Sequence, residues 1–248
     1  MDQPIVFDMP HATGFTNART AWLDGLLPPL IVAHGYKTAV DVGCGVGYFS
    51  AYLRNLGLRV VATDGRAENV AEAKRRLPDV TCAVHDVEDR SLRQLGVFDV
   101  VLCVGLLYHL ENPFAAIRNL HALTGRLLIV ESVVVPGTRA GAVLLDEPGG
   151  RDQALQDSVL VVSEPALIKM LYRAGFPFVY RADPLPKHDD FRETPLLHRR
   201  RTVVVAATAP IDSPILRHVP EPLSRSPWEK VWARRAWRVA RFIRGGGR

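Results

Sequence analysis

The most constraining feature of the sequence is a glycine-rich turn that follows a short apolar segment at residues 38–42. The segment carries a carboxylate, Asp41, and glycines then occupy every second position at Gly43, Gly45 and Gly47. Glycine adopts positive φ angles readily and lets a ligand approach the backbone closely. A helix is predicted to follow. We therefore expect free N–H groups of the turn to lie at a helix N-terminus, where they favour an adenosine-containing ligand.

The spacing of these glycines separates two classes of nucleotide-binding protein. It reads GxGxG, whereas the dinucleotide fingerprint of NAD-dependent oxidoreductases reads GxGxxG. Asp41 also places a carboxylate where a pyrophosphate would be repelled and a cationic group attracted. A sulfonium cofactor with an amino-acid tail therefore fits this turn better than NAD, and an oxidoreductase is the disfavoured alternative.

The composition is that of a single globular α/β domain with additions. The 248 residues are 48% apolar and 23% charged, which is ordinary for a folded domain. No stretch has the roughly 18 uninterrupted apolar residues that a spanning helix needs, and the first residues lack the pattern of a signal peptide. Cys44, Cys82 and Cys103 have neither disulfide nor metal-site spacing, so we expect a reducing, cytoplasmic compartment and no bound metal.

The basic charge of the chain is concentrated near its C-terminal end. Residues 226–248 hold seven Lys or Arg and one acid, so the rest of the chain is near neutral although the net charge is +5. Residues 228–243 are predicted to form an amphipathic helix that carries three of the four tryptophans. This helix could dock on the domain itself, attach the protein peripherally to an anionic membrane, or, as a less favoured alternative, bind RNA.

Strands and helices alternate over most of the chain. The strands are rich in β-branched residues, and such alternation implies a parallel sheet that is covered by helices on both faces. Strands are predicted at residues 38–42, 58–63, 80–84, 97–104 and 126–132, and helices at 46–56, 66–77 and 112–123, with a short helical piece near 89–95.

The alternation stops after the fifth predicted strand. Residues 136–162 look like an insertion, because they show little periodicity and contain several glycines and prolines. A helix over 163–174, capped by Ser163, and two strands at 176–181 and 201–208 are predicted to end the domain. With no helix between them, these two strands should pair in the antiparallel direction.

The N-terminal part of the chain lies outside this alternation. A helix is predicted over 16–34, with Thr16 or Asn17 as its cap and with Pro28 and Pro29 as the point where it kinks or divides. The chain therefore divides into three predicted parts, which are an N-terminal helical lid (1–35), the domain that holds the glycine turn (36–209) and a basic tail (210–248).

Residues 36–208 resemble the class I S-adenosylmethionine (SAM)-dependent methyltransferases. The resemblance rests on the glycine turn and on residues 103–113, which read Cys-Val-Gly-Leu-Leu-Tyr-His-Leu-Glu-Asn-Pro at the end of the fourth predicted strand. The Leu-Tyr-His-Leu-x-x-Pro pattern is similar to that of methyltransferases acting on small molecules and of the enzymes that carboxymethylate the wobble uridine of tRNA. The resemblance implies an α/β, Rossmann-like sheet, mostly parallel with a C-terminal antiparallel hairpin and with helices on both faces.

Carboxylates at the ends of two strands are candidate adenosine ligands. Asp64 follows the second strand, where open α/β sheets bind their ligands, and can accept both ribose hydroxyls; its alternative role is to cap the next helix. The resemblance implies that Asp86 accepts the adenine amino group while Val87 packs on the ring. It also implies that the carbonyls of Val104 and Gly105 meet the methionine amino group. The expected SAM site therefore comprises Asp41, Gly43, Cys44, Gly45, Gly47, Asp64, Asp86, Val87, Val104 and Gly105.

Three residues are candidates for the reacting end of the site. The resemblance places Tyr108 and His109 opposite the reacting methyl group. His109 can act as a general base for an acceptor hydroxyl, because imidazole changes protonation near neutral pH, or it can merely bond within its loop. Glu131 ends the fifth strand and therefore points at the same cleft, where it binds the acceptor or caps a turn.

Irregular segments over the strand ends are expected to supply further substrate contacts. They contain Glu147, His188 and the arginine run 199–201, none of which the sequence assigns individually. The arginines are equally consistent with a solvated strand end. Aromatic and basic residues of the N-terminal segment are candidates for a lid that excludes water, namely Phe7, Phe15 and Arg19.

The function predicted from these observations is transfer of a methyl group from SAM to an O, N or C nucleophile of a small-molecule acceptor. The first alternative is a tRNA-modifying (carboxy)methyltransferase, which the near-neutral body of the chain disfavours, because RNA-binding clefts are usually surrounded by positive charge. The second is a non-catalytic SAM-binding protein that acts as a membrane or RNA adaptor through its basic tail. The intact glycine turn with Asp41, Asp64 and Asp86 argues against loss of catalysis.

Overall fold

The structure is a computed structural model that describes residues 6–147, 149–150, 152–192 and 201–223. Its strands are β1 (Thr38–Val42), β2 (Arg59–Asp64), β3 (Thr81–Val84), β4 (Phe98–Val104), β5 (Thr124–Val133), β6 (Ala142–Asp146), β7 (Ser158–Val162), β8 (Phe178–Ala182), β9 (Arg201–Ala207) and β10 (Leu216–His218). Its α-helices are α1 (Pro10–Asp24), α2 (Leu27–His34), α3 (Tyr48–Asn55), α4 (Ala67–Arg76), α5 (Pro113–Leu123) and α6 (Glu164–Ala174). Short 3₁₀ helices are η1 (Val6–Asp8), η2 (Arg90–Leu95), η3 (Leu107–His109) and η4 (Asp189–Phe191).

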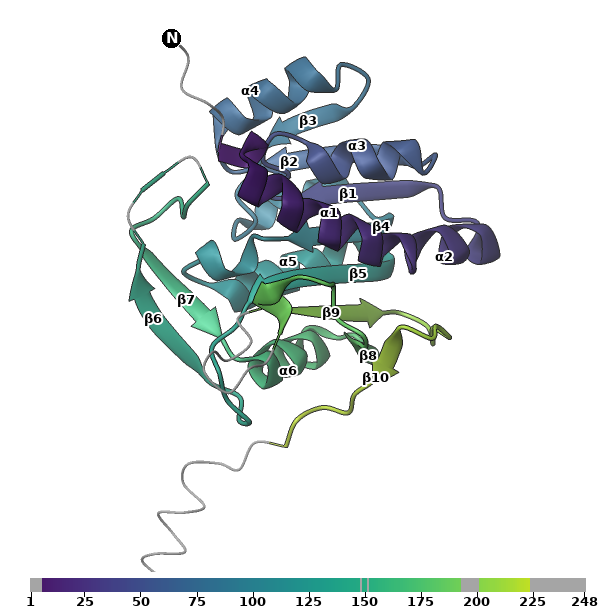
Figure 1. Ribbon diagram of the computed structural model, residues 1–248, viewed down its shortest axis with the longest axis vertical. Helices are drawn as coiled ribbons and strands as arrows, with labels where there is room; N and C mark the ends of the chain where they lie inside the picture. Colours follow the sequence, from purple (N-terminus) through teal and green to yellow (C-terminus); the bar gives the residue numbers. More distant parts are fainter. Residues whose placement is uncertain (1–5, 148, 151, 193–200, 224–248) are drawn as a thin grey trace, which may run out of the picture.

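The described residues form an eight-stranded central sheet with the order β10-β8-β9-β5-β4-β1-β2-β3 (Figure 1). β1 runs parallel to β2 and β4, with Val40 opposite Val61 and Val101, and β4 runs parallel to β5. β9 lies antiparallel to both β5 and β8. The predicted parallel sheet and its terminal antiparallel pair are therefore confirmed, and the carboxyl ends of β1, β2, β4 and β5 meet at one edge.

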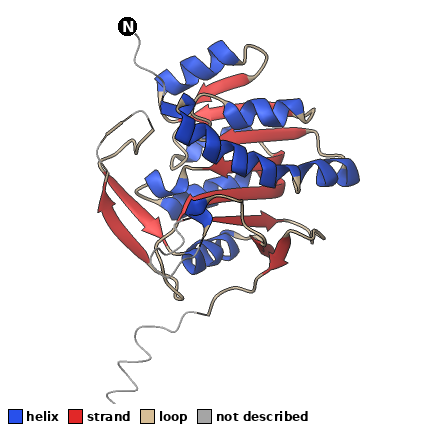
Figure 2. Ribbon diagram, viewed as in Figure 1, coloured by secondary structure: helices blue, strands red, loops and turns tan. Residues whose placement is uncertain are grey.

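Helices cover both faces of this sheet, as the alternation of strands and helices predicts (Figure 2). Successive side chains of a strand point to opposite faces. On β4, Val100 and Leu102 pack with residues of α1 to α4, whereas Val101 and Cys103 pack with residues of α5 and α6. The sheet thus lies between two apolar cores, which fix the edge where the strands end.

The N-terminal helix begins earlier than the sequence predicts. α1 starts at Pro10 rather than at Thr16 or Asn17, and proline fits the first turn because its missing N–H has no helical partner there. The chain divides before Pro28, which lies in the first turn of α2 instead of kinking a continuous helix. α1 therefore includes Phe15, which the sequence placed ahead of the helix.

The segment 136–162, predicted only as an insertion, contains the β6–β7 hairpin, with Val143 opposite Val161. Figure 1 shows this hairpin standing apart from the main sheet. Every residue of β6 is exposed, so the strand lacks the alternation of apolar and polar residues by which strands are recognised. After it, the side chain of Ser163 accepts a hydrogen bond from the N–H of Ala166 (3.3 Å) and caps α6, as predicted.

The C-terminal part of the chain adds one short strand. β10 pairs with β8 in the antiparallel direction and was not predicted, because three residues carry no recognisable pattern. Arg199, Arg200 and the amphipathic helix predicted at 228–243 lie outside the described residues, so their roles stay predictions. Within the part of the chain that the structure describes, no helix combines the length and the apolar character that crossing a membrane requires.

A buried amide in α5 holds the loop that follows β3. Nδ2 of Asn119 donates to the carbonyls of Val87 (2.8 Å) and Asp89 (3.1 Å), and Oδ1 accepts from Nε of Arg93 (2.8 Å). Asn119→Ala leaves these carbonyls without a donor, so we expect the free energy of unfolding to fall by about 1–3 kcal/mol in urea denaturation. Asn55→Ala, at an exposed position of α3, is the matched control and should change it by less than about 0.5 kcal/mol. Equal effects of the two variants would contradict this role.

Asp41 is a buried carboxylate beneath the glycine turn. Only 2% of its surface is exposed, and its Oδ2 accepts a 2.6 Å hydrogen bond from Oγ of Ser50 in α3. Burial disfavours the charged carboxylate and raises the pKa of Asp41 to about 7, against the opposing effect of the Ser50 hydrogen bond. The folded state therefore holds this proton more tightly than the unfolded state does.

This buried proton predicts a specific dependence of stability on pH. Because the pKa of Asp41 is about 7 in the folded state and about 4 in the unfolded chain, the group makes stability fall as pH rises between these values. Asp41→Asn keeps an acceptor for Ser50 and removes the titration, so this decline should disappear from urea denaturation measured across the range. The exposed Asp79→Asn is the matched control and should retain the decline. The prediction fails when both variants follow the wild-type curve.

Candidate active site

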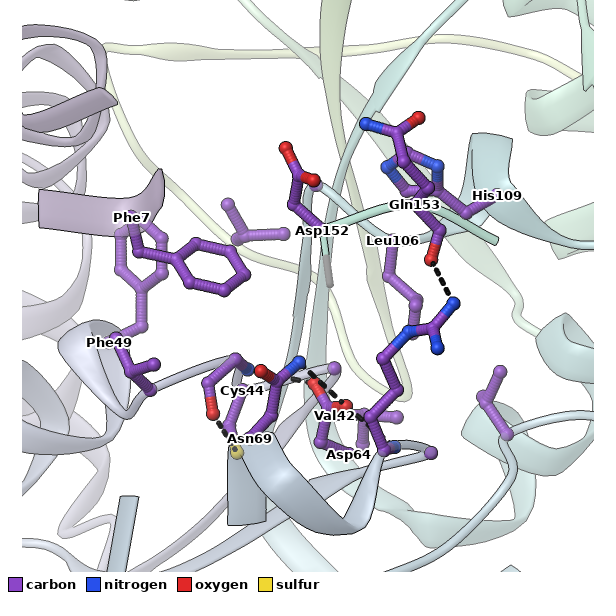
Figure 3. Close-up of a pocket in the computed structure, with 18 of the residues that line it drawn as sticks. Phe7, Val42, Cys44, Phe49, Asp64, Asn69, Leu106, His109, Asp152 and Gln153 are labelled. Carbon is purple, nitrogen blue, oxygen red and sulfur yellow. Dashed lines mark hydrogen bonds between the residues drawn. The ribbon is translucent and has the colours of Figure 1, made fainter. Parts of the chain in front are cut away.

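A cleft with about 240 Å³ of internal space opens at the carboxyl ends of β1, β2 and β4 (Figure 3). Ligands of open α/β sheets bind at this edge. Eight of the ten predicted cofactor residues line the cleft, namely Gly43, Cys44, Gly45, Asp64, Asp86, Val87, Val104 and Gly105. Tyr108 and His109 line it as well, whereas Asp41, Gly47 and Glu131 do not.

The first N–H groups of the glycine turn are bonded within the protein rather than free. The N–H groups of Gly43 and Cys44 both donate to the carbonyl of Thr63, at 2.8 and 2.9 Å, and the N–H of Gly45 donates to Oδ2 of Asp64 at 2.9 Å. The expectation that these groups are free for a ligand is therefore wrong, because the end of β2 already uses them. The glycines instead permit close packing, since a Cβ at Gly43 would lie 2.7 Å from a leucine side chain.

Asp41 and Gly47 support the turn from behind instead of facing the cleft. Asp41 lies beneath the turn on Ser50, as described above. Gly47 has a φ of 93° at the start of α3, and a Cβ there would lie 2.8 Å from Cδ1 of Leu77. The requirement for glycine at this position therefore comes from its positive φ, with the close approach of Leu77 as a second contribution.

Asp64 connects the glycine turn to α4. Besides its bond to the turn, its Oδ1 accepts from the N–H of Arg66 at 2.9 Å and from Nδ2 of Asn69 at 3.2 Å. Asp64 thus holds the residue that precedes α4 and also lines the cleft (Figure 3). Farther along the same wall, Asp86 accepts from the N–H of Glu88 at 2.9 Å and lines the cleft too.

A buried ion-pair cluster lies at the other end of the cleft. Glu131, whose side chain is 2% exposed, lies near the carboxyl end of β5, with Oε2 2.8 Å from Nη2 of Arg19 in α1. Its Oε1 accepts from Nη1 of Arg201 in β9 at 3.0 Å. The ring of Phe15 lies against both guanidinium groups, 3.6 Å from Arg19 and 4.6 Å from Arg201. Glu131 therefore holds two arginines that line the cleft but does not line it itself, which corrects its expected position.

Arg201 is not the solvated strand end that the arginine run allowed. Its side chain is only 13% exposed, and its Nη2 donates to the phenol oxygen of Tyr108 at 2.9 Å. Burial raises the pKa of Tyr108, so the phenol keeps its proton. Because the oxygen of Tyr108 accepts from Arg201, its own O–H can be donated to a ligand in the cleft.

Arg19 carries an unused donor at this end of the cleft. Its side chain is 11% exposed, and its buried Nε has no hydrogen-bond partner among the described residues. Its guanidinium lies over Gly105, with Nη2 3.5 Å from the position of a Cβ there. Burial lowers the pKa of Arg19, against the opposing charge of Glu131. The sequence predicts only a lid role for Arg19. The one local sign of this cluster in the sequence is that Arg19 lies four residues after Phe15.

His109 meets a carboxylate from the insertion. Its Nδ1 lies 2.6 Å from Oε2 of Glu147, and the same oxygen accepts from the N–H of Ala154 at 2.9 Å. The sequence named both residues but could not pair them, because they are 38 positions apart. His188 instead lies against Phe15, with ring centroids 4.8 Å apart, and does not line the cleft.

The N-terminal segment covers one side of the cleft. The ring of Phe7 lies over the glycine turn, 3.2 Å from the position of a Cβ at Gly45. Its neighbour Asp8 accepts from both Nη atoms of Arg76, at 2.9 and 2.7 Å, and from the phenol of Tyr48 at 3.0 Å. These bonds attach the segment to α3 and α4.

The insertion covers the opposite side. Nη2 of Arg66 donates to the carbonyls of Gln153 (3.3 Å) and Ala154. Leu155 follows and packs against Gly65, where a Cβ would lie 2.5 Å from its Cδ1. The described residues between β6 and β7 thus contact the start of α4 as well as His109.

The fold and the cleft can now be compared with known proteins. Residues 40–126 match a family model described as "Methyltransferase domain". The tRNA U34 carboxymethyltransferase of Psychromonas ingrahamii is 31% identical over 175 residues, which cover 68% of this chain and 52% of that protein. The protein of the same name from Methylococcus capsulatus is 32% identical over 162 residues, which cover 62% and 48%. The chain spans about half the length of the curated relatives that it matches.

Solved structures support the same assignment. The N-terminal domain of EvdMO1 with bound SAH has a TM-score of 0.58 at 22% identity, covering 77% of this chain and 79% of that one. The magnesium protoporphyrin IX methyltransferase of Synechocystis PCC 6803 with bound SAM has a TM-score of 0.54 at 21% identity, covering 84% and 87%. These likenesses establish the fold, and the matched domain at residues 40–126 lies within it. The chain belongs to the class I SAM-dependent methyltransferases.

Proposed function

We propose that the chain binds SAM in this cleft and transfers its methyl group to a small acceptor beside Tyr108 and His109. One observation carries the proposal: the glycine-rich turn, the carboxylates of Asp64 and Asp86 and the side chain of Arg19 line a single cleft. That set matches a cofactor with an adenosine end and an amino-acid end. An NAD-binding site would instead need donors for a pyrophosphate, and the N–H groups of Gly43, Cys44 and Gly45 are already bonded within the protein.

The residues of the cleft fit each part of the cofactor. Asp64 accepts three hydrogen bonds within the protein, and a carboxylate can accept about four, which leaves a position for a ribose hydroxyl. Asp86 and the apolar Val87 suit the polar edge and the face of adenine. The guanidinium of Arg19, whose Nη2 and Nη1 lie over Gly105, suits the carboxylate of the amino-acid tail.

The protein contributes alignment and exclusion of water to the reaction. SAM supplies an electrophilic methyl carbon on its sulfonium. Transfer of this methyl group disperses the positive charge, and a site without water favours such a reaction. Phe7 and Phe15 cover the cleft from the N-terminal side, and the described residues between β6 and β7 cover it from the other. Tyr108 offers an O–H donor for orienting the acceptor.

The small size of the cleft favours a compact acceptor. Its internal space of about 240 Å³ lies between the two covering segments. This enclosure favours a small molecule, or a single ring inserted from a larger one. No broad basic trough is formed by the lining residues that the structure describes, since Arg19 and Arg201 share the buried Glu131.

A second candidate is carboxymethyl transfer to tRNA, which the names of the curated relatives suggest. The transferred group would then carry a carboxylate that a methyl group lacks. The specific observation in favour is that Arg201 and Tyr108 place charged N–H and phenol O–H groups together at the reacting end of the cleft. A target base would enter after flipping out of its stack.

Calorimetry on the full chain tests the cofactor proposal. We expect S-adenosylhomocysteine to bind with a Kd in the micromolar range, about 8 kcal/mol, and NAD not to bind. Arg19→Met removes the donor above Gly105 and should weaken this binding by about 10- to 100-fold. Arg54→Met, on the outer surface of α3, is the matched control and should bind normally. Binding of NAD without S-adenosylhomocysteine would overturn the proposal.

Tyr108→Phe separates the two candidate reactions. For methyl transfer we expect the wild type to prefer SAM over its carboxymethyl-sulfonium analogue, and the variant to keep this preference. For carboxymethyl transfer the wild type would prefer the analogue, and loss of the phenol O–H would reduce that preference by about tenfold. Donor competition in single-turnover assays measures the preference. Tyr52→Phe, which loses only a surface hydrogen bond to Asp24, is the matched control.

A further inference from the structure

His109 and Glu147 form a hydrogen-bonded pair at the reacting end of the cleft. His109 comes from η3, directly after β4, whereas Glu147 directly follows β6. Nδ1 of His109 lies 2.6 Å from Oε2 of Glu147, and the two side chains are 12% and 17% exposed. Figure 3 shows His109 beside Gln153, across the cleft from the glycine turn.

The carboxylate of Glu147 is itself held in place. Its Oε2 accepts from the N–H of Ala154, and its own N–H donates to the carbonyl of Asp157 at 2.8 Å. β7 packs against the same turn, where the N–H of Leu160 donates to the carbonyl of Leu110. The insertion is therefore attached both to His109 and to the residue that follows it.

The contact with Glu147 determines which nitrogen of the His109 imidazole carries the hydrogen. With Nδ1 facing a carboxylate, the neutral ring carries its hydrogen on Nδ1, and its lone pair lies on Nε2. Nε2 makes no hydrogen bond to a described residue, and His109 lines the cleft. The lone pair is thus available to a group bound there.

We propose that Glu147 is a positioning residue that makes His109 the general base, and that the acceptor is a hydroxyl or another group that must lose a proton. This inference rests on the proposed function, and it holds for both candidate acceptors. The acceptor atom forms its bond to the transferred carbon as the electron pair of the carbon–sulfur bond goes to sulfur. Its proton passes to Nε2 of His109, and Glu147 stabilises the imidazolium that results.

Other titratable or charged groups also face the imidazole of His109. They are Tyr108 on η3, with its ring centroid 4.0 Å from that of His109, Asp152 in the insertion, and Arg201 and Glu131 behind Tyr108. Arg201 and Glu131 form an ion pair, so their charges largely offset one another. Glu147 alone among these groups contacts an imidazole nitrogen.

The pH dependence of turnover distinguishes positioning from a structural role. Glu147→Gln keeps an acceptor for Nδ1 but removes the charge that favours the imidazolium. We expect the acidic limb of the kcat profile to move to lower pH and the plateau to fall about tenfold. His109→Ala should lower kcat by about 10²- to 10⁴-fold, and adding Glu147→Gln to it should cost nothing further. Asp146→Asn, exposed on β6 beside Glu147, is the matched control and should match the wild type.

A readout independent of turnover keeps the inference separate from the proposed function. NMR titration of the His109 imidazole in the full chain should give a lower midpoint in Glu147→Gln than in the wild type or Asp146→Asn. An unchanged midpoint, or a kcat profile that does not follow it, overturns the role of Glu147. If the chain fails to bind S-adenosylhomocysteine, the proposed function falls and the base assignment falls with it. If it binds and turns over while the Glu147 variants behave as wild type, only the pairing is wrong.

Discussion

The buried carboxylate of Glu131 connects three parts of the molecule that are far apart in the sequence. It lies near the carboxyl end of β5 in the central sheet and pairs with Arg19 from α1 and with Arg201 from the antiparallel hairpin. Removing one member of a buried ion pair typically costs about 3–5 kcal/mol, because the remaining charge loses its compensation. The reacting end of the cleft depends on this carboxylate, since Arg201 in turn holds Tyr108.

The sheet and most of the cleft wall follow from local sequence. β1 has its predicted bounds, and the other strands predicted for the central sheet begin and end within two residues of the expected positions. Each is a short apolar run closed by a turn or by a helix start, which is a strong local signal. Because ligands bind where parallel strands end, the positions of Asp64, Asp86 and Gly105 on the cleft wall could be predicted from their places after those strands.

The contacts that give the cleft its chemistry could not be predicted in this way. Glu147 meets His109 across 38 residues, and Arg19 meets Glu131 through the docking of a helix on the sheet. The periodicity of the sequence does not indicate either pairing, because both contacts form only through tertiary packing. The N–H groups of the glycine turn show the same effect, since the carbonyl of Thr63 on a neighbouring strand removes donors that the turn alone would offer.

The described residues between β6 and β7 touch both ends of the cleft. Glu147 bonds to His109, while the carbonyls of Gln153 and Ala154 accept from Arg66, which starts α4 beside Asp64. A ligand at either end would contact this same segment, and linkage requires that any effect of one ligand on the affinity for the other is reciprocal.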